Sequence, residues 1–596
     1  MRITTKLFHG PNIYANVPIV LITIKVLSAQ PEVLIETCKE IEKFLPNYVD
    51  ENISKILTPY THFGMLMSNF AFNLINKNKG LLTSYGAKES SDAILSWVEF
   101  DTPEVTLKAI ELFFNIFLPL LQKKQLSSAA IDQAIVNYAE FAKKYSNYDY
   151  ELLSGSKSLD IPSFKFMTNS LYRQYGWGKN SRVFRGSSPM EDSYHGVFVS
   201  MDKVASKELL KSIGMPVVKD VVIQSREQLQ KAAETIGYPC VVKPIRGAQA
   251  IGISVNILSF DELQNAFDHA KQSSFGNNPI MIEENINGYA HRIHVVRGKF
   301  FVSIKKMPPI LIGNGISTIQ SLIEEINIQR MDVRKNPDSL KQIQINDELI
   351  VYLKKFHLTL QSILSDNQEF QLSTTFTYGV HGASIENTTN ITHPDIIHMA
   401  EAIAKVTHID MLAIDYITSD ISKSFHEIKS AICEYNHTPG LGSLKVLGAS
   451  LYTPLEVART FIGDEVGRIP IFLVLVENSH LGKIDTWFIN NIKESSVGYM
   501  CGDKVAVGRF VLNTYESQGW DSAKMLLRQK TTDKVFLICD KEEVLEKGLP
   551  VDSFDTIFYD QITDDWLVVL DNATARLQKY SQLDVLFELL EKELSN

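Results

Sequence analysis

Short apolar segments alternate with longer segments of helical periodicity along the whole chain, and this alternation constrains the fold most strongly. Strands that alternate with helices predict α/β domains. Because 596 residues are too many for one hydrophobic core, we expect about three or four domains. The strand-like segments are 18–27, 240–244, 279–283, 413–417, 431–435 and 471–476, and the clearest helical segments are 31–44, 103–121 and 203–213.

Changes in pattern suggest where the domains meet. The polar stretch 154–158 (Ser-Gly-Ser-Lys-Ser) is typical of a junction. A second strand-then-helix region begins at 467–470 (Gly-Arg-Ile-Pro). We therefore predict an α+β domain at 1–160, a central domain at 161–465 and an α/β domain at 466–596.

Composition excludes several classes of partner. A formal net charge of -10 gives no basic field for nucleic acid or an anionic membrane. Near the N-terminus the best apolar run, 17–27, is about half the length that crosses a bilayer and contains Lys25, and no signal peptide is evident. The five cysteines are dispersed without a Cys-x-x-Cys pair, which is typical of reduced thiols. We expect a cytoplasmic protein with a small-molecule substrate.

Two lysines and one acidic segment are candidates for binding a nucleotide. Lys203 opens a helical segment, and Lys243 closes an apolar strand just before a loop that contains Gly247 and Gly252. A lysine in that position can meet phosphate oxygens, although a surface lysine at a strand end fits equally well. The apolar strand that ends at Glu283 could be a hinge whose backbone binds adenine, or simply a solvated strand end.

Three polar residues embedded in apolar strands predict a metal site. Asp415 lies within 413–417, and Glu434 and Asn436 lie two apart in the next strand, so they point to the same side. Charged groups in apolar strands are unfavourable unless they are paired or bind a cation. Oxygen-only ligands suit Mg²⁺, and a plain salt-bridge network is the alternative.

The order of the motifs resembles the ATP-grasp fold and, more narrowly, the cyanophycin synthetase family. The similarity runs from about residue 3 to 560. The motifs are 201–207 (Met-Asp-Lys-x-x-Ser-Lys), 237–244 (Gly-Tyr-Pro-x-Val-Val-Lys-Pro), 282–288 (Ile-Glu-Glu-x-Ile-x-Gly), 414–415 (Ile-Asp), 434–440 (Glu-x-Asn-x-x-Pro-Gly), 10–13 (Gly-Pro-Asn-Ile) and 175–179 (Tyr-Gly-Trp-Gly-Lys).

The resemblance implies that Mg-ATP binds in the central domain and activates a carboxylate as an acyl phosphate. Lys203 and Lys243 would bind the phosphates, and Glu283, Glu284 and Ile286 would line the adenine pocket. Mg²⁺ would be held by Asp415, Glu434 and Asn436, and the acyl phosphate would be stabilised by Arg292 and Lys243. Without the resemblance, Arg292 is better interpreted as an exposed strand arginine.

Three segments depart from the family pattern. The family's loop histidine and arginine are replaced by Gln249 and Ile251, and an acid that would touch ribose is replaced by Ala290. The family's arginine-containing stretch appears as 373–379 (Ser-Thr-Thr-Phe-Thr-Tyr-Gly), whose hydroxyls cannot reproduce bidentate guanidinium contacts. We expect nucleotide binding to be retained and the acid-substrate end to be rebuilt.

The terminal regions resemble family domains without their chemistry. Residues 466–596 resemble the start of a Mur-ligase-like domain, but its P-loop corresponds to 476–482, where Glu477 would repel phosphate. Because the chain also ends at Asn596, we expect a degenerate, truncated domain with a structural or dimerisation role. The N-terminal domain has no His-x-x-x-His motif at 65–69, so we expect no peptidase activity, and we interpret His62 as a surface or capping residue.

Two functions remain open. The first is an ATP-dependent ligase that resembles the short, second form of cyanophycin synthetase, joins amino acids or β-aspartyl dipeptides into a polymer or peptide, and forms a dimer or tetramer. The second is a catalytically reduced homologue that binds nucleotide or polymer and partners an active ligase. The retained lysines and metal ligands favour the first function, and the altered loops favour the second.

Overall fold

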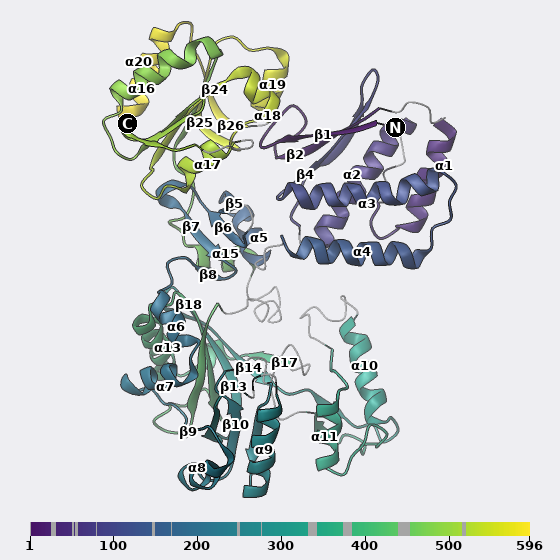
Figure 1. The fold of residues 1–596 in the computed structure, drawn as a ribbon, viewed down its shortest axis with the longest axis vertical. Coiled ribbons are helices and arrows are strands. Elements are labelled where there is room, and N and C mark those ends of the chain that lie inside the picture. The colour runs from purple at the N-terminus through teal and green to yellow at the C-terminus, as the bar shows by residue number, and fades with distance from the viewer. Residues whose placement is uncertain are drawn as a thin grey trace. The chain divides into compact units, whose positions relative to one another are not determined.

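The computed structural model describes residues 2–25, 31–50, 53, 58–78, 80–145, 150–167, 170–246, 251–273, 275, 277–331, 342–372, 384–438, 453–514, 520–571 and 573–595. They form two compact units (Figure 1). The terminal unit combines Met1–Val183 with Ile462–Asn596, and the central unit is Phe184–Phe461. Helices and sheets occur in both units, which confirms the predicted multidomain α/β class. The division at 1–160, 161–465 and 466–596 stays a prediction. Within the described ranges, no helix is both long and apolar enough to cross a membrane.

The N-terminal part of the terminal unit packs helices onto an antiparallel sheet of strand order β1-β2-β4-β3. Alternate residues of the central strands, such as Val20, Ile22 and Val98, are buried in the helix-covered core. The strands are β1 (Arg2–Phe8), β2 (Ile19–Lys25), β3 (Tyr85–Glu89) and β4 (Ile94–Glu99), and the helices are α1 (Pro31–Phe44), α2 (Pro59–Lys77), α3 (Pro103–Leu121), α4 (Ser128–Lys143) and α5 (Tyr150–Ser158). Helices α1 and α3 have the predicted bounds.

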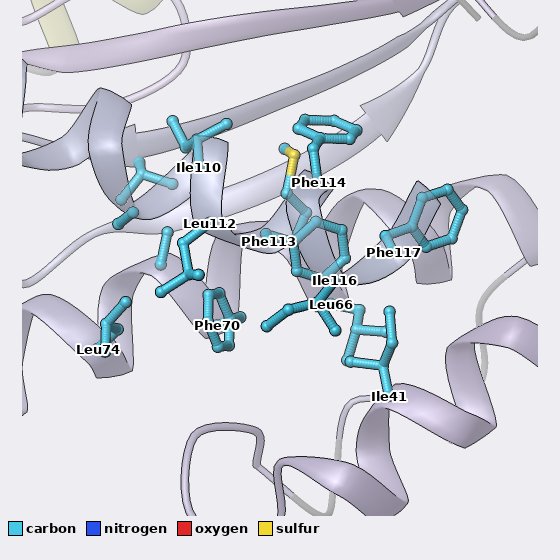
Figure 2. Packing of buried hydrophobic residues seen from close by; sticks show 14 of the residues in the cluster. Ile41, Leu66, Phe70, Leu74, Ile110, Leu112, Phe113, Phe114, Ile116 and Phe117 are labelled. Carbon is cyan, nitrogen blue, oxygen red and sulfur yellow. The ribbon is translucent and has the colours of Figure 1, made fainter. Parts of the chain in front are cut away.

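Helices α2 and α3 pack through apolar side chains that recur every three or four residues. Phe70 and Leu74 of α2 and Phe113 and Phe117 of α3 are buried in one cluster (Figure 2). The rings of Phe113 and Phe117 stack with their centroids 5.9 Å apart, because residues four apart lie on one side of a helix. Each such ring contributes roughly 1.5–3 kcal/mol when it is buried, so this cluster is a main source of stability here.

Two interpretations of this part are wrong. Residues 154–158, expected to be a junction, form the second half of α5, because Leu153 is buried and the Ser156 hydroxyl donates to the Leu153 carbonyl within the helix. His62, expected at the surface, is only 9% exposed. Its Nε2 lies 3.1 Å from Glu42 Oε1, which connects α2 to α1.

The C-terminal part of the terminal unit is a sheet of order β23-β22-β21-β24-β20-β25-β26, in which β21, β24, β20, β25 and β26 run parallel. All six residues of β20 are buried, because Leu473 and Val474 face separate helix-covered cores. The elements are β20 (Ile471–Val476), β21 (Val497–Cys501), β22 (Lys504–Val507), β23 (Phe510–Leu512), β24 (Lys534–Asp540), β25 (Ser553–Tyr559), β26 (Thr574–Lys579), α16 (Leu481–Asn491), α17 (Asp521–Arg528), α18 (Lys541–Lys547), α19 (Asp564–Asp571) and α20 (Leu583–Ser595).

The central unit contains two antiparallel sheets that carry the site. In the first sheet, of order β11-β10-β12-β9, Val242 and Ile282 are buried against α8 and α9. Residues of odd number in β10 and β12 therefore point to the opposite face. The elements are β9 (Asp220–Ile223), β10 (Cys240–Pro244), β11 (Ser254–Ile257), β12 (Ile280–Glu284), α8 (Leu229–Ile236) and α9 (Phe260–Gln272).

The second sheet of the central unit has the order β17-β14-β13-β18-β19. Ile293 of β13 and Ile414 of β18 are buried in a cluster with α13, so their neighbours Arg292 and Asp415, which are paired across the strands, face away from that helix. The elements are α7 (Lys203–Ser212), β13 (Tyr289–Val296), β14 (Lys299–Met307), β17 (Ser384–Asn387), α13 (Pro394–Thr407), β18 (Met411–Thr418) and β19 (Ala431–His437).

Smaller elements complete the described fold. The strand pair β15-β16 packs with α10 and α11 around a small apolar cluster. The boundary between the two units falls within β7. These elements are β5 (Ser163–Lys165), β6 (Tyr172–Tyr175), β7 (Arg182–Arg185), β8 (Ser188–Pro189), α6 (Tyr194–Ser200), β15 (Ile310–Ile312), α10 (Ile319–Met331), α11 (Asp347–Lys355), β16 (Glu369–Gln371) and α15 (Pro454–Ile462).

Candidate functional site

A buried carboxylate and two lysines lie together beside the first sheet of the central unit. Glu283 of β12 is 4% exposed, and its Oε2 lies 2.8 Å from Lys243 Nζ of β10. Its other oxygen accepts a hydrogen bond from Lys207 of α7. The structure thus joins Lys243, predicted to bind phosphate, to Glu283, predicted to line the adenine pocket, and adds Lys207.

Electrostatic interactions keep Lys243 and Glu283 charged. Burial alone would lower the pKa of Lys243, but Glu283, with smaller contributions from Cys433 and Glu434, raises that pKa to about 12. Burial alone would raise the pKa of Glu283, yet Lys243 and then Lys207 hold it below its ordinary value. Burial does dominate at Lys207 and lowers its pKa. Lys243 therefore remains protonated at neutral pH and can donate to an anion.

The three predicted metal ligands lie together on β18 and β19. Asp415 is paired with Glu434 across the strands, and Asn436 follows two residues later on the same face. Asn436 Nδ2 lies 3.3 Å from Asp415 Oδ2 and 3.5 Å from Glu434 Oε1. Because the orientation of an amide is assigned from its hydrogen bonds, the Asn436 oxygen can occupy the same position. The Asn436 amide oxygen would then lie beside one carboxylate oxygen of Asp415 and one of Glu434.

This donor set fits Mg²⁺ rather than a softer ion. Mg²⁺ binds through one or two carboxylates and keeps positions for phosphate oxygens and water, which two carboxylates and an amide provide. In the part of the chain that the structure describes, no group of three or more His, Cys, Asp or Glu side chains could hold a metal ion. The mixed carboxylate–amide set on β18 and β19 is therefore the candidate metal site, and its occupancy stays a prediction.

Basic side chains surround the candidate metal ligands. Asp415 Oδ1 lies 2.9 Å from Lys306 Nζ, and Asp415 Oδ2 lies 3.0 Å from Arg292 Nη1. Burial would raise the pKa of Asp415, but Lys306 and then Arg292 lower it to about 2. Lys203 Nζ lies 3.7 Å from Glu434 Oε2. The structure therefore brings Lys203 and Arg292 to the candidate metal ligands, and their roles in binding phosphate stay predictions.

The two groups of charges meet at β19. Glu434 pairs with Lys203 and also contributes to the raised pKa of Lys243. Asp202 caps the N-terminus of α7, because its side chain accepts hydrogen bonds from backbone N–H groups of the first helical turn. The lysine, arginine and carboxylate side chains of both groups therefore influence one another's charge around β19.

Three residues of this region were not predicted from the sequence. Lys207 follows Lys203 by four residues on one helix, so helical spacing could have identified it. His294 follows Arg292 by two residues on β13, so strand alternation could have placed it on the same face. It is fully buried, neither ring nitrogen has a hydrogen-bond partner among the described residues, and burial lowers its pKa to about 3. Only the register of β14 distinguishes Lys306 from its neighbour Lys305.

The other predicted adenine-lining residues are not gathered with the lysines. Glu284 points away from Glu283 and lies 2.7 Å from Lys429 Nζ. Ile286 is 7% exposed and belongs to a small apolar cluster. Their contact with adenine stays a prediction.

The loops that differ from the family pattern are only partly described. Gly252 adopts a φ of +74°, and a Cβ there would approach Ser273 Oγ to 2.8 Å, so the end of this loop requires glycine. Ile251 is 43% exposed, and Ala290 lies in β13. Gln249 and residues 373–379 lie outside the described residues.

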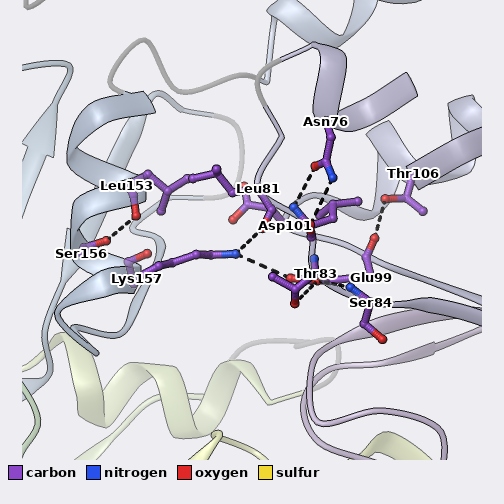
Figure 3. Close-up of polar contacts among 12 residues, drawn as sticks. Asn76, Leu81, Thr83, Ser84, Glu99, Asp101, Thr106, Leu153, Ser156 and Lys157 are labelled. Atoms are coloured by element: carbon purple, nitrogen blue, oxygen red, sulfur yellow. Dashed lines mark hydrogen bonds and ion pairs between the residues drawn. The ribbon is translucent and has the colours of Figure 1, made fainter. Parts of the chain in front are cut away.

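A concave region lies in the terminal unit, between the start of α3 and α5. This pocket encloses about 70 Å³, and its charged groups are already paired (Figure 3). Lys157 Nζ donates to the Leu81 carbonyl at 2.5 Å and lies 3.7 Å from Glu99 Oε1. Asp101 accepts two hydrogen bonds from Arg173. Because these contacts satisfy the charges within the protein, we assign them a structural role.

The loop after β20 is the one predicted to correspond to the P-loop of a Mur-ligase-like domain. It leads from Val476 through a short 3₁₀ turn (Asn478–His480) into α16. A Cβ on Gly482 would meet nothing within 4 Å, so no close backbone approach requires this glycine. The loss of phosphate binding here stays a prediction.

Several known proteins match parts of this chain. Residues 202–300 match the family model of the carbamoyl-phosphate synthase L chain, ATP binding domain. The cyanophycin synthetase of Trichormus variabilis is 30% identical over 390 residues, which cover 64% of this chain and 42% of that protein. The glutathione biosynthesis bifunctional protein of Clostridium perfringens is 23% identical over 261 residues, covering 44% of this chain and 33% of that protein. A bifunctional glutathione synthetase from Pasteurella multocida superposes with a TM-score of 0.37 at 18% identity, covering 58% and 49% of the two chains.

The chain spans less than half the length of these curated relatives. Over the matched residues, the comparisons confirm the resemblance to the cyanophycin synthetases that the motifs predicted.

Proposed function

We propose that this relative of the cyanophycin synthetases is an ATP-dependent carboxylate–amine ligase that acts through an acyl phosphate. The observation that carries the proposal is the meeting of two charge groups at β19. Lys203 Nζ lies 3.7 Å from Glu434 Oε2, beside the other candidate Mg²⁺ ligands, and the charge of Glu434 also contributes to the raised pKa of Lys243. Phosphoryl transfer to a carboxylate requires hydrogen-bond donors to the phosphates and oxygen ligands for the metal ion in one place.

The chemistry would proceed in two steps. The substrate carboxylate attacks the γ-phosphorus of ATP, which breaks the bond to ADP and forms an acyl phosphate. Lys203 and Lys243 donate to phosphate oxygens and so reduce repulsion between the two anions. Mg²⁺ held by Asp415, Glu434 and Asn436 would supply further charge neutralisation. The amine then attacks the carbonyl carbon and loses a proton, and inorganic phosphate leaves.

Arg292 is suited to hold the transferred group. Its guanidinium lies at Asp415 and is 21% exposed, so it can reach a ligand on the same face. A planar guanidinium can donate two parallel hydrogen bonds to a phosphate, which would stabilise the acyl phosphate until the amine attacks. This role depends on the ligase assignment.

For substrates we propose amino acids or β-aspartyl dipeptides, joined into a cyanophycin-like polymer or peptide. The names of the relatives support this class, and a mildly acidic chain suits a cationic substrate. We also propose Mg²⁺ as the metal, a cytoplasmic location and a homodimer or tetramer. The five cysteines, all unpaired, support a reducing compartment.

The decisive experiment measures phosphate release from Mg-ATP with a panel of amino acids and β-aspartyl dipeptides, followed by mass spectrometry of the products. We expect amide products from the wild type and a loss of about 100-fold or more in turnover for Asp415→Asn. Asp420→Asn is the matched control, because Asp420 is exposed and bonds only locally to Ser422. Tight Mg-ATP binding without any product would refute the ligase and support a nucleotide- or polymer-binding partner, the function that the altered loops favour.

A further inference from the structure

Both carboxylate oxygens of Asp415 accept hydrogen bonds from basic side chains. Oδ1 accepts from Lys306 Nζ at 2.9 Å, and Oδ2 accepts from Arg292 Nη1 at 3.0 Å. All three side chains are between 17% and 21% exposed. A metal ion that takes Asp415 as a ligand competes with both cations for these oxygens, so at least one basic side chain must find another anion.

The register of β14 selects Lys306 as that side chain. Arg292 is paired with Ile304, so Lys306, two residues further, lies on the face of Arg292. Lys305 points to the other face, where its Nζ lies 3.2 Å from Glu386 and 4.2 Å from the centre of the Tyr289 ring. The two adjacent lysines therefore have different surroundings.

The charge balance of this face indicates the kind of anion. Three basic side chains, Lys203, Arg292 and Lys306, lie against two carboxylates, Asp415 and Glu434. Among the side chains that the structure describes on this face, positive charge is already in excess, and a divalent cation would increase it. A partly buried ammonium without a counter-charge is unfavourable, so binding of the metal requires a multiply charged anion at the same place.

We propose that Lys306 is a phosphate-binding residue that exchanges partners, holding Asp415 without nucleotide and donating to the terminal phosphate of ATP once Asp415 binds the metal. The inference rests on the proposed function and deepens it. The same ammonium would stay with the phosphoryl group after its transfer to the substrate carboxylate. Lys306 then discriminates ATP from ADP, because only ATP carries the terminal phosphate.

The test compares two nucleotides without any turnover. Isothermal titration calorimetry measures the Kd of Mg-ADP and of the Mg complex of the non-hydrolysable β,γ-imido analogue of ATP. Lys306→Met should weaken the analogue about 10-fold or more, the loss expected for one charge-assisted hydrogen bond, and should change the Kd of ADP less than about 3-fold. Lys306→Arg should recover most of the loss, and Lys305→Met should resemble the wild type for both nucleotides.

The outcomes separate this proposal from the ligase assignment. The role of Lys306 is overturned if Lys306→Met weakens the binding of ADP and of the analogue equally, or changes neither Kd. It is also overturned if Lys305→Met has the same effect as Lys306→Met. If Lys306→Met does not fold, as judged by its circular dichroism spectrum, Lys306→Gln replaces it under the same criteria. A wild type that prefers the analogue but forms no product refutes only the ligase, whereas a wild type that binds neither nucleotide refutes both.

Discussion

Replacing Glu283 by glutamine tests whether the buried charges hold the central unit together. Glu283→Gln keeps the shape of the side chain and removes its charge. Lys207 and Lys243, whose side chains are 3% and 8% exposed, then lose the carboxylate between them. Among the described residues, Lys207 then retains only Asp220 as an ion-pair partner, at 3.8 Å.

The expected magnitude follows from the burial of both partners. Removing one member of a buried ion pair destabilises a protein by about 3–5 kcal/mol, because the remaining charge is left uncompensated. Since Asp220 still offsets part of the charge on Lys207, we expect a loss of about 3 kcal/mol in the free energy of unfolding of the central unit. Adding Lys207→Met to Glu283→Gln should recover part of this loss, because one uncompensated ammonium disappears.

Glu284→Gln is the matched control. It changes the adjacent residue in the same way, but Glu284 pairs with Lys429, whose side chain is 69% exposed. An exposed pair of this kind contributes at most about 1 kcal/mol. The contrast between the two neighbours therefore isolates the effect of burial.

Hydrogen exchange is the suitable assay, because all five tryptophans lie outside Phe184–Phe461. Tryptophan emission therefore follows the terminal unit and serves as an internal reference. Exchange of β10 and β12 amides, read by mass spectrometry in increasing urea, should show the loss in Glu283→Gln. If Glu283→Gln and Glu284→Gln lower the free energy of unfolding by the same small amount, the attraction between Glu283 and its lysines only balances the loss of their hydration. The stabilising role of the buried charges is then refuted.

Two further predictions concern other buried charges. The folded-state pKa of His294, about 3, lies below the ordinary 6.5, so its contribution to stability is complete above about pH 6.5 and falls by about 2 kcal/mol at pH 5. His294→Leu should therefore flatten the loss of β13 amide protection between pH 7.5 and 5, and an unchanged slope would contradict this. Asp101→Asn leaves Arg173, which is 2% exposed, without its bidentate partner. It should lower the free energy of unfolding by about 2 kcal/mol, measured as a lower urea midpoint of the tryptophan emission, whereas an unchanged midpoint would show that other groups balance Arg173.

The strands and the longer helices could be predicted from local patterns. The helices at Pro31–Phe44 and Pro103–Leu121 and the strand Cys240–Pro244 have the predicted bounds, because their apolar spacing is regular and proline marks where the helices begin. The stretch 154–158 was misjudged, because its small polar residues are common in loops, while the buried Leu152 and Leu153 anchor the helix that contains it. Tertiary packing outweighed local propensity there.

The sequence was enough to predict many of the residues that form the candidate site, but not which residues each of them contacts. Lys243, Asp415 and Arg292 belong to recognisable motifs, whereas their contacts join residues far apart in the chain. Lys207 meets Glu283 from another element, and Lys306 meets Asp415 from a strand that shares no hydrogen bonds with β18. Such pairs depend on strand register and helix placement, which a single sequence does not specify.

A bulge in β19 shows most clearly why alternation alone could not place Glu434, a candidate metal ligand, opposite Asp415. Ile432 and Tyr435 are both buried in the cluster with α13, although strict alternation would send residues three apart to opposite faces. The register shifts between Asp415 and Tyr416, so that Glu434 opposes Asp415 while Ile432 opposes Tyr416. The extra residue lets β19 bury an apolar side chain on either side of the bulge. The carboxylate is thereby aimed at the charged face, as bulges beside active sites commonly do.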